Sequence, residues 1–527
     1  MFLIMSAQYI DKELQSEFGK LPPSFLPLGN RRLFQHQVKL APSDKDIYIS
    51  VPESYDICEF DLNWLNKNKV NIIYTPEGLK LGESLIAAIN LSENRLDKSL
   101  CLLFGDTLFN EIPSNEDVVS ISTSIDEYEW TIAENILSND DINPFYNKEV
   151  SESAVNGFFN FSNPRQLLFA LTKSKGDFFE GLITYQKNTK LTTHLASDWM
   201  DFGHVNTYYR SKSNFTTQRA FNNLLITNDY IKKSSDKIEK IKSEANWFCE
   251  IPYSIRKYTP QYLGGGNKEE KAEYKLEYLY NTSVNELYVF SDISLNTWNK
   301  IVRLCVEFLK ECRSEECKQD NHHANILNSL FVNKTHARLQ DFCNQRRINL
   351  SDVWIYRGKE FSIQDILDIS EAFLPQDESP VSVMHGDFCF SNILYDTRSQ
   401  KIKVIDPRGI DEDGNSTIYG DVRYDIAKLS HSIIGLYDLI LAGYYDVKID
   451  GGNIELNIYE KDKHREVQKN FISIIYKEFN ISLNQLKAMQ IQLFLSMLPL
   501  HFDDTNRQNA LFANAFRLCY EIIRGEK

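Results

Sequence analysis

The residues with the most definite chemistry lie in the stretch Met384–Asp396, which reads MHGDFCFSNILYD. Four residues separate Asp387 from Asn392, and fourteen residues after Asn392 comes Asp406, at the end of the aliphatic run IKVID. In phosphoryl transfer from ATP, an Asp orients the acceptor hydroxyl and takes its proton, while an Asn and a second Asp hold Mg²⁺ on the phosphates. The spacing therefore predicts Asp387 as the catalytic base and Asn392 and Asp406 as metal ligands.

Such a site also needs a basic residue on the nucleotide phosphates, carried by a strand and paired with a Glu of the next helix. The segment YIKKSS places Lys232 and Lys233 on a predicted strand, and Glu244 lies on the helix predicted for DKIEKIKSEANWFCEIP. Because side chains alternate along a strand, only one of the two lysines can face the site. We favour Lys233 and keep Lys232 open, the alternative being that both lysines and the Glu are ordinary surface residues. The strand YKLEYLY would then bring the backbone of Glu277 and Tyr278 to the adenine.

The surrounding sequence predicts an α/β part followed by an α+β part. Residues 1 to about 130 alternate aliphatic runs such as MFLIM and VNIIYT with the helical segment LGESLIAAINL, a pattern typical of a mostly parallel sheet. A composition shift near residue 216 introduces the predicted strand LLITNDYIKKSS, and from about Thr297 the pattern is helical apart from the hairpin NILYD–KIKVID. We expect domains at 1–215, 216–295 and 296–527.

Composition excludes some classes of function. The chain has 527 residues, a net charge of −15 and no long Lys/Arg run, which argues against nucleic-acid binding. No apolar run reaches the roughly 20 residues that span a membrane, and the N-terminal apolar run is too short for a signal segment, so we expect a cytoplasmic protein without membrane insertion. Nothing in the sequence indicates an oligomeric state. The cluster Cys312, Cys317, His322 and His323 fits no standard zinc spacing, and we interpret it as a solvated loop.

The C-terminal motifs VMHGDFCFSNILYD, IKVIDPRG and GDVRYDIAKLSHS resemble the aminoglycoside phosphotransferase and choline kinase family, over roughly residues 216–527. The resemblance implies a bilobal protein-kinase-like fold that uses ATP and Mg²⁺ to phosphorylate a small-molecule alcohol such as choline, ethanolamine, a polyol or a sugar. It implies the roles given above for Asp387, Asn392 and Asp406, and it makes Asp425 a structural residue that steadies the catalytic loop.

The acceptor is left open by these motifs. A quaternary ammonium needs aromatic and acidic side chains, and residues of this kind occur near the motifs. The candidates are Tyr419, Tyr424, Tyr437 and Asp438, with ordinary packing as the alternative. The sequence Asp-Pro-Arg at Asp406 departs from the family pattern, and Arg408 could bind an anionic or polyol acceptor or pair with a carboxylate.

Two carboxylates stand out in the first half of the chain. Asp106 ends the run LLFGD and Asp201 lies in DWMDFGH, so the two could form an Mg²⁺ pair for a nucleotide, the alternative being turn or cap residues. Residues 1 to about 215 resemble sugar-phosphate nucleotidyltransferases, on the first strand, FLPL, the strand-Gly-Asp segment, NGFFNF and WMDFGH. The resemblance implies a Rossmann-like nucleotidyltransferase sheet in which Asp106 and Asp201 hold the metal bound to CTP or another NTP.

The phosphate loop of that family is altered here. The glycine-rich loop is replaced by SAQYIDKELQSEFGK, and the activating Lys of the family aligns with Pro23. That role is therefore empty or passes to Lys20, Arg31 or Arg32. A degenerate loop of this kind keeps open a domain without catalytic activity.

Together the two halves predict a fused enzyme whose C-terminal half phosphorylates a small alcohol. The N-terminal half would then transfer a nucleotidyl group to the product, as capsule or other surface-glycan biosynthesis requires. One alternative is an active kinase joined to a non-catalytic domain that binds a nucleotide sugar. Another is a non-catalytic sensor or regulator.

Overall fold

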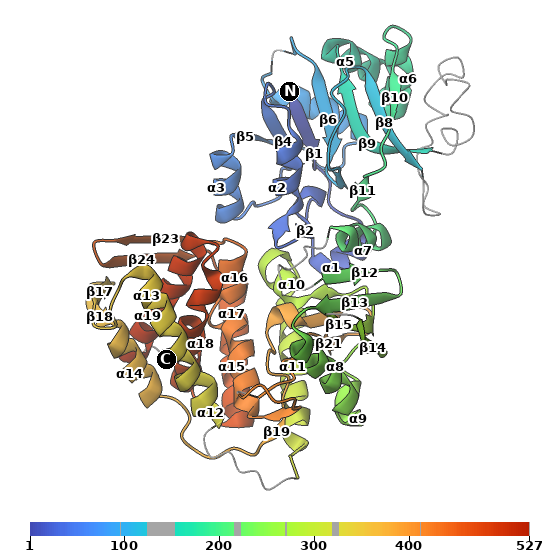
Figure 1. Ribbon diagram of the computed structural model, residues 1–527. Helices are drawn as coiled ribbons and strands as arrows, with labels where there is room; N and C mark the ends of the chain where they lie inside the picture. The colour runs from blue at the N-terminus through green and yellow to red at the C-terminus, as the bar shows by residue number, and fades with distance from the viewer. Residues whose placement is uncertain are drawn as a thin grey trace. The chain divides into compact units, whose positions relative to one another are not determined.

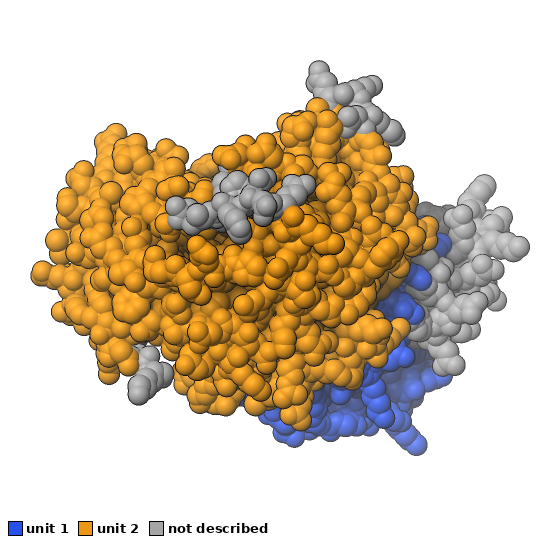
Figure 2. Space-filling view, turned by 90° about the horizontal axis from the view of Figure 1, so that it is seen from below, with its two compact units in different colours: residues 1–216, 290–292 blue, residues 217–289, 293–527 orange. Residues whose placement is uncertain are grey.

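The computed structural model describes residues 1–94, 96–123, 153–215, 223–268, 271–318, 326–411 and 413–525. The chain forms two compact units, which are coloured separately in Figure 2. Unit 1 contains residues 1–216 and 290–292, and unit 2 contains residues 217–289 and 293–527. Both units combine helices and strands, so the protein is mixed α/β (Figure 1).

Unit 1 is built on a seven-stranded sheet in the order β10-β8-β9-β6-β1-β4-β5. The strands are β1 Phe2–Met5, β4 Ile47–Pro52, β5 Val70–Thr75, β6 Leu100–Phe104, β8 Val118–Thr123, β9 Ser153–Phe161 and β10 Thr192–Leu195. Strand pairs β1·β4, β1·β6, β4·β5 and β8·β10 are parallel. Strand β9, which contains NGFFNF, is antiparallel to both β6 and β8, so the sheet is mixed.

The sheet of unit 1 is buried on both faces. In β1, Leu3 and Met5 belong to one core cluster, whereas Phe2 and Ile4 belong to the other, as the two-residue period of a strand requires. The first cluster includes residues of α4, α5 and α6, and the second includes residues of α2 and α3. These helices are α2 Leu33–Gln37, α3 Glu59–Lys67, α4 Leu81–Leu91, α5 Pro164–Lys173 and α6 Phe178–Gln186. Burial on both faces explains why the strands read as nearly continuous apolar runs.

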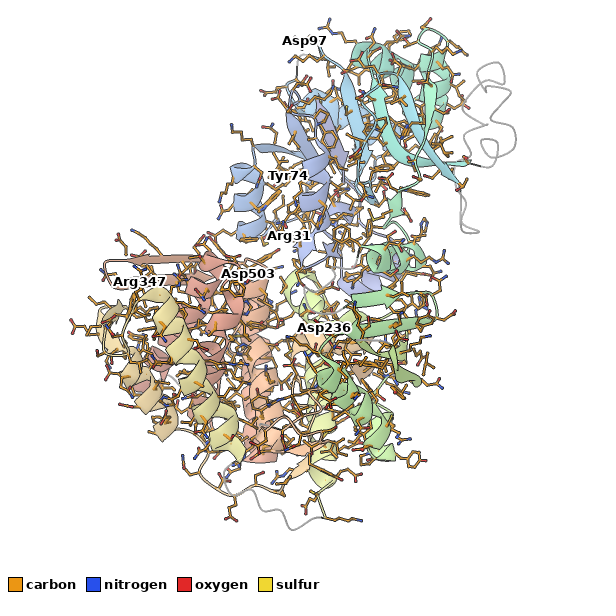
Figure 3. All side chains as sticks on the ribbon, viewed as in Figure 1. Arg31, Tyr74, Asp97, Asp236, Arg347 and Asp503 are labelled. Atoms are coloured by element: carbon orange, nitrogen blue, oxygen red, sulfur yellow. The ribbon has the colours of Figure 1, made fainter. Side chains whose placement is uncertain are left out.

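Unit 2 begins with an antiparallel sheet in the order β12-β13-β15-β14. The strands are β12 Asn223–Ile226, β13 Tyr230–Ser235, β14 Tyr262–Lys268 and β15 Lys271–Glu277. The segment LLITNDYIKKSS, expected to be one strand, is a hairpin, because Thr227, Asn228 and Asp229 turn the chain. The glycines Gly264, Gly265 and Gly266 lie in β14, where pairing with β15 overrides their low strand propensity. Helix α8, Ile238–Glu250, connects β13 to the rest of this sheet, and Figure 3 labels Asp236 just before it.

The remainder of unit 2 is mainly helical. Its longer helices are α11 Leu295–Ser314, α13 Lys334–Arg346, α14 Ile363–Ala372, α15 Val422–Ile433, α17 Asp462–Phe479, α18 Leu483–Met497 and α19 Thr505–Arg524. Helix α18 packs against α13, α14, α15 and α19 and lies at the centre of this part. The expectation that this part is helical apart from the hairpin NILYD–KIKVID is wrong, because four further strands form another sheet: β17 Val353–Tyr356, β18 Lys359–Ser362, β23 Tyr445–Asp450 and β24 Asn453–Ile458. Within the described ranges, no helix combines the length and the apolar character needed to cross a membrane.

Candidate active site

A β-hairpin positions the two residues predicted as metal ligands. Strands β20, Ile393–Asp396, and β21, Lys401–Val404, pair in antiparallel register, and beyond them the Ile405 N–H donates to the Asn392 carbonyl at 3.0 Å. Asn392 therefore lies across the hairpin from the residue that precedes Asp406. Asp406 has a φ of 56°, a left-handed conformation that is costly for a residue other than Gly and is concentrated at functional sites.

Asp387 lies at the same end of the hairpin. The Asn392 Nδ2 group donates to the Asp387 carbonyl at 2.9 Å and to its Oδ2 atom at 3.0 Å. Lys428 Nζ lies 2.9 Å from Asp387 Oδ1, and 41% of the Asp387 side chain is exposed. Partial burial disfavours the charged carboxylate and so raises the pKa of Asp387. Lys428 outweighs this effect and, with Asn392, lowers the pKa to about 2. The carboxylate is therefore ionised at neutral pH and still accessible to a small molecule.

Asp425 fixes the backbone of the loop that carries Asp387. The two oxygens of Asp425 accept hydrogen bonds from the N–H groups of His385, at 2.7 Å, and Gly386, at 2.8 Å. Gly386 has a φ of 78°, and a Cβ there would lie 2.6 Å from the Cβ of Arg408. Asp425 is fully buried, so it fixes the backbone of the loop and does not face a substrate.

Lys233 is the lysine that the structure brings to Asp406. Its Nζ lies 2.6 Å from Glu244 Oε2 and 3.1 Å from Asp406 Oδ1, and only 7% of its side chain is exposed. Burial lowers the pKa of Lys233, but Asp406 and Glu244 raise it more, so the amine stays charged. Tyr274 donates a hydrogen bond of 3.0 Å to Glu244 Oε2. Lys232 points to the other face of the strand, where its Nζ lies 3.5 Å from Glu273 Oε2.

The backbone predicted to meet adenine is partly engaged within the chain. The Glu277 N–H donates to the Gln261 carbonyl at 2.9 Å, and the Tyr278 N–H donates to the Asp229 carbonyl at 3.0 Å. These two donors are therefore already used, and an adenine at this position would have to meet other backbone groups. Binding of a nucleotide by Glu277 and Tyr278 stays a prediction.

In unit 1 the structure brings Asp106 and Asp201 together. A Cβ on Gly203 would lie 2.8 Å from Asp106 Oδ2 and 3.3 Å from Asp201 Oδ1, so both carboxylates border the same small space. Burial and the neighbouring charge of Asp201 raise the pKa of Asp106 to about 7. Thr207 donates to Asp201 Oδ2, and His204 Nδ1 lies 3.5 Å from the same oxygen. Two crowded carboxylates are the arrangement that a divalent cation relieves.

Of the three basic candidates for the altered phosphate loop, Arg32 is buried and Arg31 and Lys20 are exposed. Arg32 is 1% exposed, pairs with Asp61 Oδ2 at 3.0 Å, and donates to the carbonyls of Phe25 and Phe290, so it is a structural residue. Arg31, labelled in Figure 3, is exposed on β3, Arg31–Arg32. Lys20 lies 3.9 Å from the centre of the Tyr9 ring and is 57% exposed. Arg32 is thereby excluded as a phosphate ligand.

The structure describes only the two cysteines of the cluster Cys312, Cys317, His322 and His323. Cys312 is buried in α11 and Cys317 is half-buried, while His322 and His323 lie outside the described residues. Within the described ranges, no three His, Cys, Asp or Glu side chains form a group that could hold a metal ion. Among the described residues, the candidate metal ligands are therefore the carboxylates of Asp106 and Asp201 in unit 1 and the amide of Asn392 with the carboxylate of Asp406 in unit 2.

Sequence reasoning missed Lys428 and Lys334. Lys428 follows Asp425 by three residues on α15, and this spacing puts both on one helix face, which was a usable signal. Lys334 donates a hydrogen bond of 3.1 Å to the hydroxyl of Tyr424, although about 90 residues separate the two. No local pattern could have indicated that contact. Tyr424, a candidate for binding a quaternary ammonium group, thus already contacts a lysine of the protein itself.

No protein-family model matches this chain, and no curated protein matches it either. One similar solved structure is a thermostable mutant of aminoglycoside phosphotransferase APH(4)-Ia in a ternary complex with AMP-PNP and hygromycin B. Its sequence identity to this chain is 12%, the alignment covers 59% of this chain and 92% of that chain, and the TM-score is 0.38. Another is a Plasmodium vivax ethanolamine kinase, with 12% identity, 62% and 92% covered, and a TM-score of 0.35. A third is the inositol-1-phosphate CTP transferase from T. maritima, with 14% identity, 42% and 97% covered, and a TM-score of 0.31. At these identities and TM-scores, function has to be argued from the residues and their contacts.

Proposed function

We propose that unit 2 is an ATP-dependent phosphotransferase with a kinase-like fold that acts on the hydroxyl of a small molecule. The observation that carries this proposal is the convergence of Lys233, Asp387, Asn392 and Asp406 from separate elements. One chain of contacts joins Glu244, Lys233 and Asp406, and a second joins Asn392, Asp387 and Lys428. The Ile405–Asn392 hydrogen bond links the two chains.

Asp387 would orient the acceptor hydroxyl and receive its proton. A carboxylate with a pKa of about 2 is a weak base, so proton transfer would come late, when the bond from the hydroxyl oxygen to phosphorus has largely formed. This order suits phosphoryl transfer, whose loose transition state needs little early activation of the nucleophile. Lys428 keeps the carboxylate ionised, and Asp425 keeps the loop in place.

Lys233 and the pair Asn392–Asp406 would serve the nucleotide. Lys233 is charged and lies beside Asp406, so it could neutralise phosphate oxygens at this point. The amide oxygen of Asn392 and the carboxylate of Asp406 are the oxygen ligands that Mg²⁺ prefers, and the hairpin puts their backbones next to each other. The metal would supply charge neutralisation between the phosphates of ATP.

For unit 1 we propose a nucleotidyltransferase-like domain in which Asp106 and Asp201 hold the metal of CTP or another NTP. The raised pKa of Asp106 and the shared space at Gly203 support a cation between the two carboxylates. Such a domain would activate the phosphorylated alcohol as a nucleotide derivative, a reaction that surface-glycan biosynthesis in the cytoplasm would use. The second candidate for unit 1 is a non-catalytic nucleotide-sugar-binding domain, which the altered phosphate loop and the buried Arg32 favour.

The test of the kinase proposal uses the full-length protein with ATP, Mg²⁺ and a panel of small alcohols, and measures ADP and phosphorylated product. Asp387→Asn should lower kcat by about 10²- to 10⁴-fold, the usual contribution of a general base. Asp450→Asn is a matched control, because Asp450 is 78% exposed on the distant hairpin of β23 and β24. An unchanged rate in Asp387→Asn would refute the assigned role.

Unit 1 needs a separate assay, namely release of pyrophosphate from CTP or another NTP in the presence of the phosphorylated alcohol. A rate that depends on Asp106 would support nucleotidyl transfer. Binding of a nucleotide sugar without turnover, across a broad NTP panel, would support the second candidate.

A further inference from the structure

Basic side chains gather around Tyr424, which is buried next to the proposed phosphoryl-transfer site. Lys334 Nζ donates to the Tyr424 hydroxyl at 3.1 Å and lies 5.5 Å from the centre of its ring. Arg338 follows Lys334 by one turn of α13, on the same face of the helix. Lys428 Nζ lies 6.0 Å from the centre of the Tyr424 ring and 2.9 Å from Asp387. Tyr424 and Lys428 therefore link the catalytic carboxylate to the basic residues of α13.

Arg408 approaches the same place from the segment after β21. Its N–H donates to the His385 carbonyl at 2.8 Å, and its side chain crosses Gly386, the residue before Asp387. One guanidinium nitrogen, Nη2, donates to the Asp411 carbonyl at 3.3 Å. The other, Nη1, is buried and has no hydrogen-bond partner in the described part of the protein. A buried donor of this kind costs free energy unless a ligand accepts from it.

We call three residues the cationic cluster: Lys334, Arg338 and Arg408. Buried or partly buried cations are usually paired with carboxylates. In the part of the chain that the structure describes, none of them forms an ion pair with a carboxylate. Burial lowers the pKa of Lys334, and the positive charges of Lys428 and Arg408 act in the same direction, whereas Tyr424 acts in the opposite direction. Like charges brought together in a partly buried site are unfavourable unless an anion is bound there.

The local field at Tyr424 also favours negative charge. Burial alone would raise the pKa of this phenol, but Lys428, Lys334 and Arg408 outweigh it and lower the pKa. Asp438, an acidic residue considered for a cationic acceptor, is 3% exposed. In addition, Ser329–Asn333, directly before Lys334, form a π-helical turn, a distortion found frequently at functional sites.

From these contacts we propose that the phosphoryl acceptor is an alcohol that also carries an oxyanion, a carboxylate or a phosphate ester, and that the cationic cluster binds this group. The proposal rests on the phosphotransferase function of unit 2 and narrows its acceptor to one charge class. The acceptor hydroxyl lies at Asp387 and the anionic group lies a few bonds away, at Lys334, Arg338 and Arg408. Quaternary ammonium and other cationic alcohols are excluded by repulsion.

The reaction balances without a further reactant. The acceptor oxygen forms a bond to the γ-phosphorus of ATP, and the bond between that phosphorus and the β,γ-bridging oxygen breaks. ADP leaves with the electron pair of that bond. The hydroxyl proton passes to Asp387 and then to solvent.

The test compares alcohols that differ in charge but share a three- or two-carbon skeleton. Glycerol, glycerate and glycerol 3-phosphate form the neutral, carboxylate and phosphate arms, and ethanolamine and choline form the cationic arm. With the wild-type protein, ATP and Mg²⁺, we expect kcat/KM for one anionic alcohol to exceed that for glycerol by about 10- to 100-fold, the effect of one or two charge-assisted hydrogen bonds. The better of the two anionic arms identifies the group that the cluster binds.

Variants of the cluster then locate the effect. Lys334→Met should raise the KM for the anionic alcohol by about tenfold or more, whereas Lys334→Glu should reduce or invert the preference for negative charge. Lys469→Met is the matched control, because Lys469 is 71% exposed on α17, where it pairs with Glu466. Arg338→Gln serves as a second variant if Lys334→Glu does not fold.

The outcomes separate this inference from the proposed function. Phosphorylation of neutral or cationic alcohols at rates equal to or above those of the anionic ones overturns the inference and leaves the kinase proposal intact. An unchanged acceptor preference in both Lys334→Met and Arg338→Gln also overturns it. Absence of phosphorylation of every alcohol, together with no effect of Asp387→Asn on consumption of ATP, overturns both.

Discussion

Replacing Lys428 by Met should make the proposed phosphoryl transfer sensitive to acid. Lys428 Nζ lies 2.9 Å from Asp387 Oδ1. Burial raises the pKa of Asp387, but the charge and hydrogen bond of Lys428 lower it to about 2, with Asn392 adding a smaller effect. When the lysine is removed, burial is no longer outweighed, so the pKa of Asp387 should rise.

The size and sign of the effect follow from this pairing. An opposite charge within hydrogen-bonding distance lowers the pKa of a carboxyl group by about 1 to 3, so the midpoint should move from about pH 2 to about pH 3–5. The reaction uses the ionised form of Asp387, and the rate therefore falls as the pH drops through the pKa. The wild-type protein should lose nothing through this group above about pH 4, whereas Lys428→Met should lose about half its kcat at the new midpoint.

The measurement is kcat between about pH 3 and pH 8 at saturating ATP and acceptor, a range that includes the expected midpoint, with circular dichroism to show that each variant stays folded. The wild-type profile corrects for titration of ATP and of the metal ligands, which all variants share. Lys428→Arg keeps the charge and should keep the flat profile. A Lys428→Met profile parallel to that of the wild type would refute the reasoning, and so would an equal acid limb in Lys428→Arg.

Two further predictions concern stability. Glu244→Gln should lower the free energy of unfolding of unit 2 by about 1–3 kcal/mol and raise the KM for ATP, because Lys233 loses one of the two carboxylates that it contacts and keeps Asp406. The control Lys240→Met removes the half-exposed lysine that pairs with Glu244 and should lower this free energy by less than about 1 kcal/mol. Equal losses for the two variants in urea unfolding would contradict the role of the buried pair. Arg32→Met should destabilise unit 1 by about 3–5 kcal/mol, because it removes the buried cation that pairs with the buried carboxylate of Asp61. Arg31→Met at the exposed neighbouring position should change the stability by about 0.5 kcal/mol or less, and similar unfolding midpoints for the two variants would show that the buried pair is not structural.

Much of the local structure could be predicted because it depends on residues close in sequence. The aliphatic runs become β1, β4, β5 and β6, and NILYD and KIKVID form the expected hairpin β20–β21. Within that hairpin the register alone puts Asn392 opposite the residue before Asp406. A period of two and a short turn are enough to determine such features.

Strand pairing decided other parts of the structure that local propensity did not indicate. The glycines at Gly264–Gly266 have a low strand propensity, yet they lie in β14 because β15 supplies the hydrogen bonds. The sheet of β17, β18, β23 and β24 was missed although its two hairpins, with turns at Arg357-Gly358 and Gly451-Gly452, carry local signals. Only the pairing of β17 with β24, which joins segments about 100 residues apart, leaves no local signal.

The composition and spacing of the chain by themselves determined which residue types could do phosphoryl transfer and which strands and helices would carry them. Only the tertiary structure decided which of two adjacent lysines meets Asp406, since this depends on which face of β13 packs against α8. It likewise buried Arg32 in a structural ion pair, and it brought the charges of Lys334 and Arg408 within range of Tyr424. The charge at the acceptor site is a sum over side chains from distant segments, so it exists only once the chain has folded and brought them within range of one another.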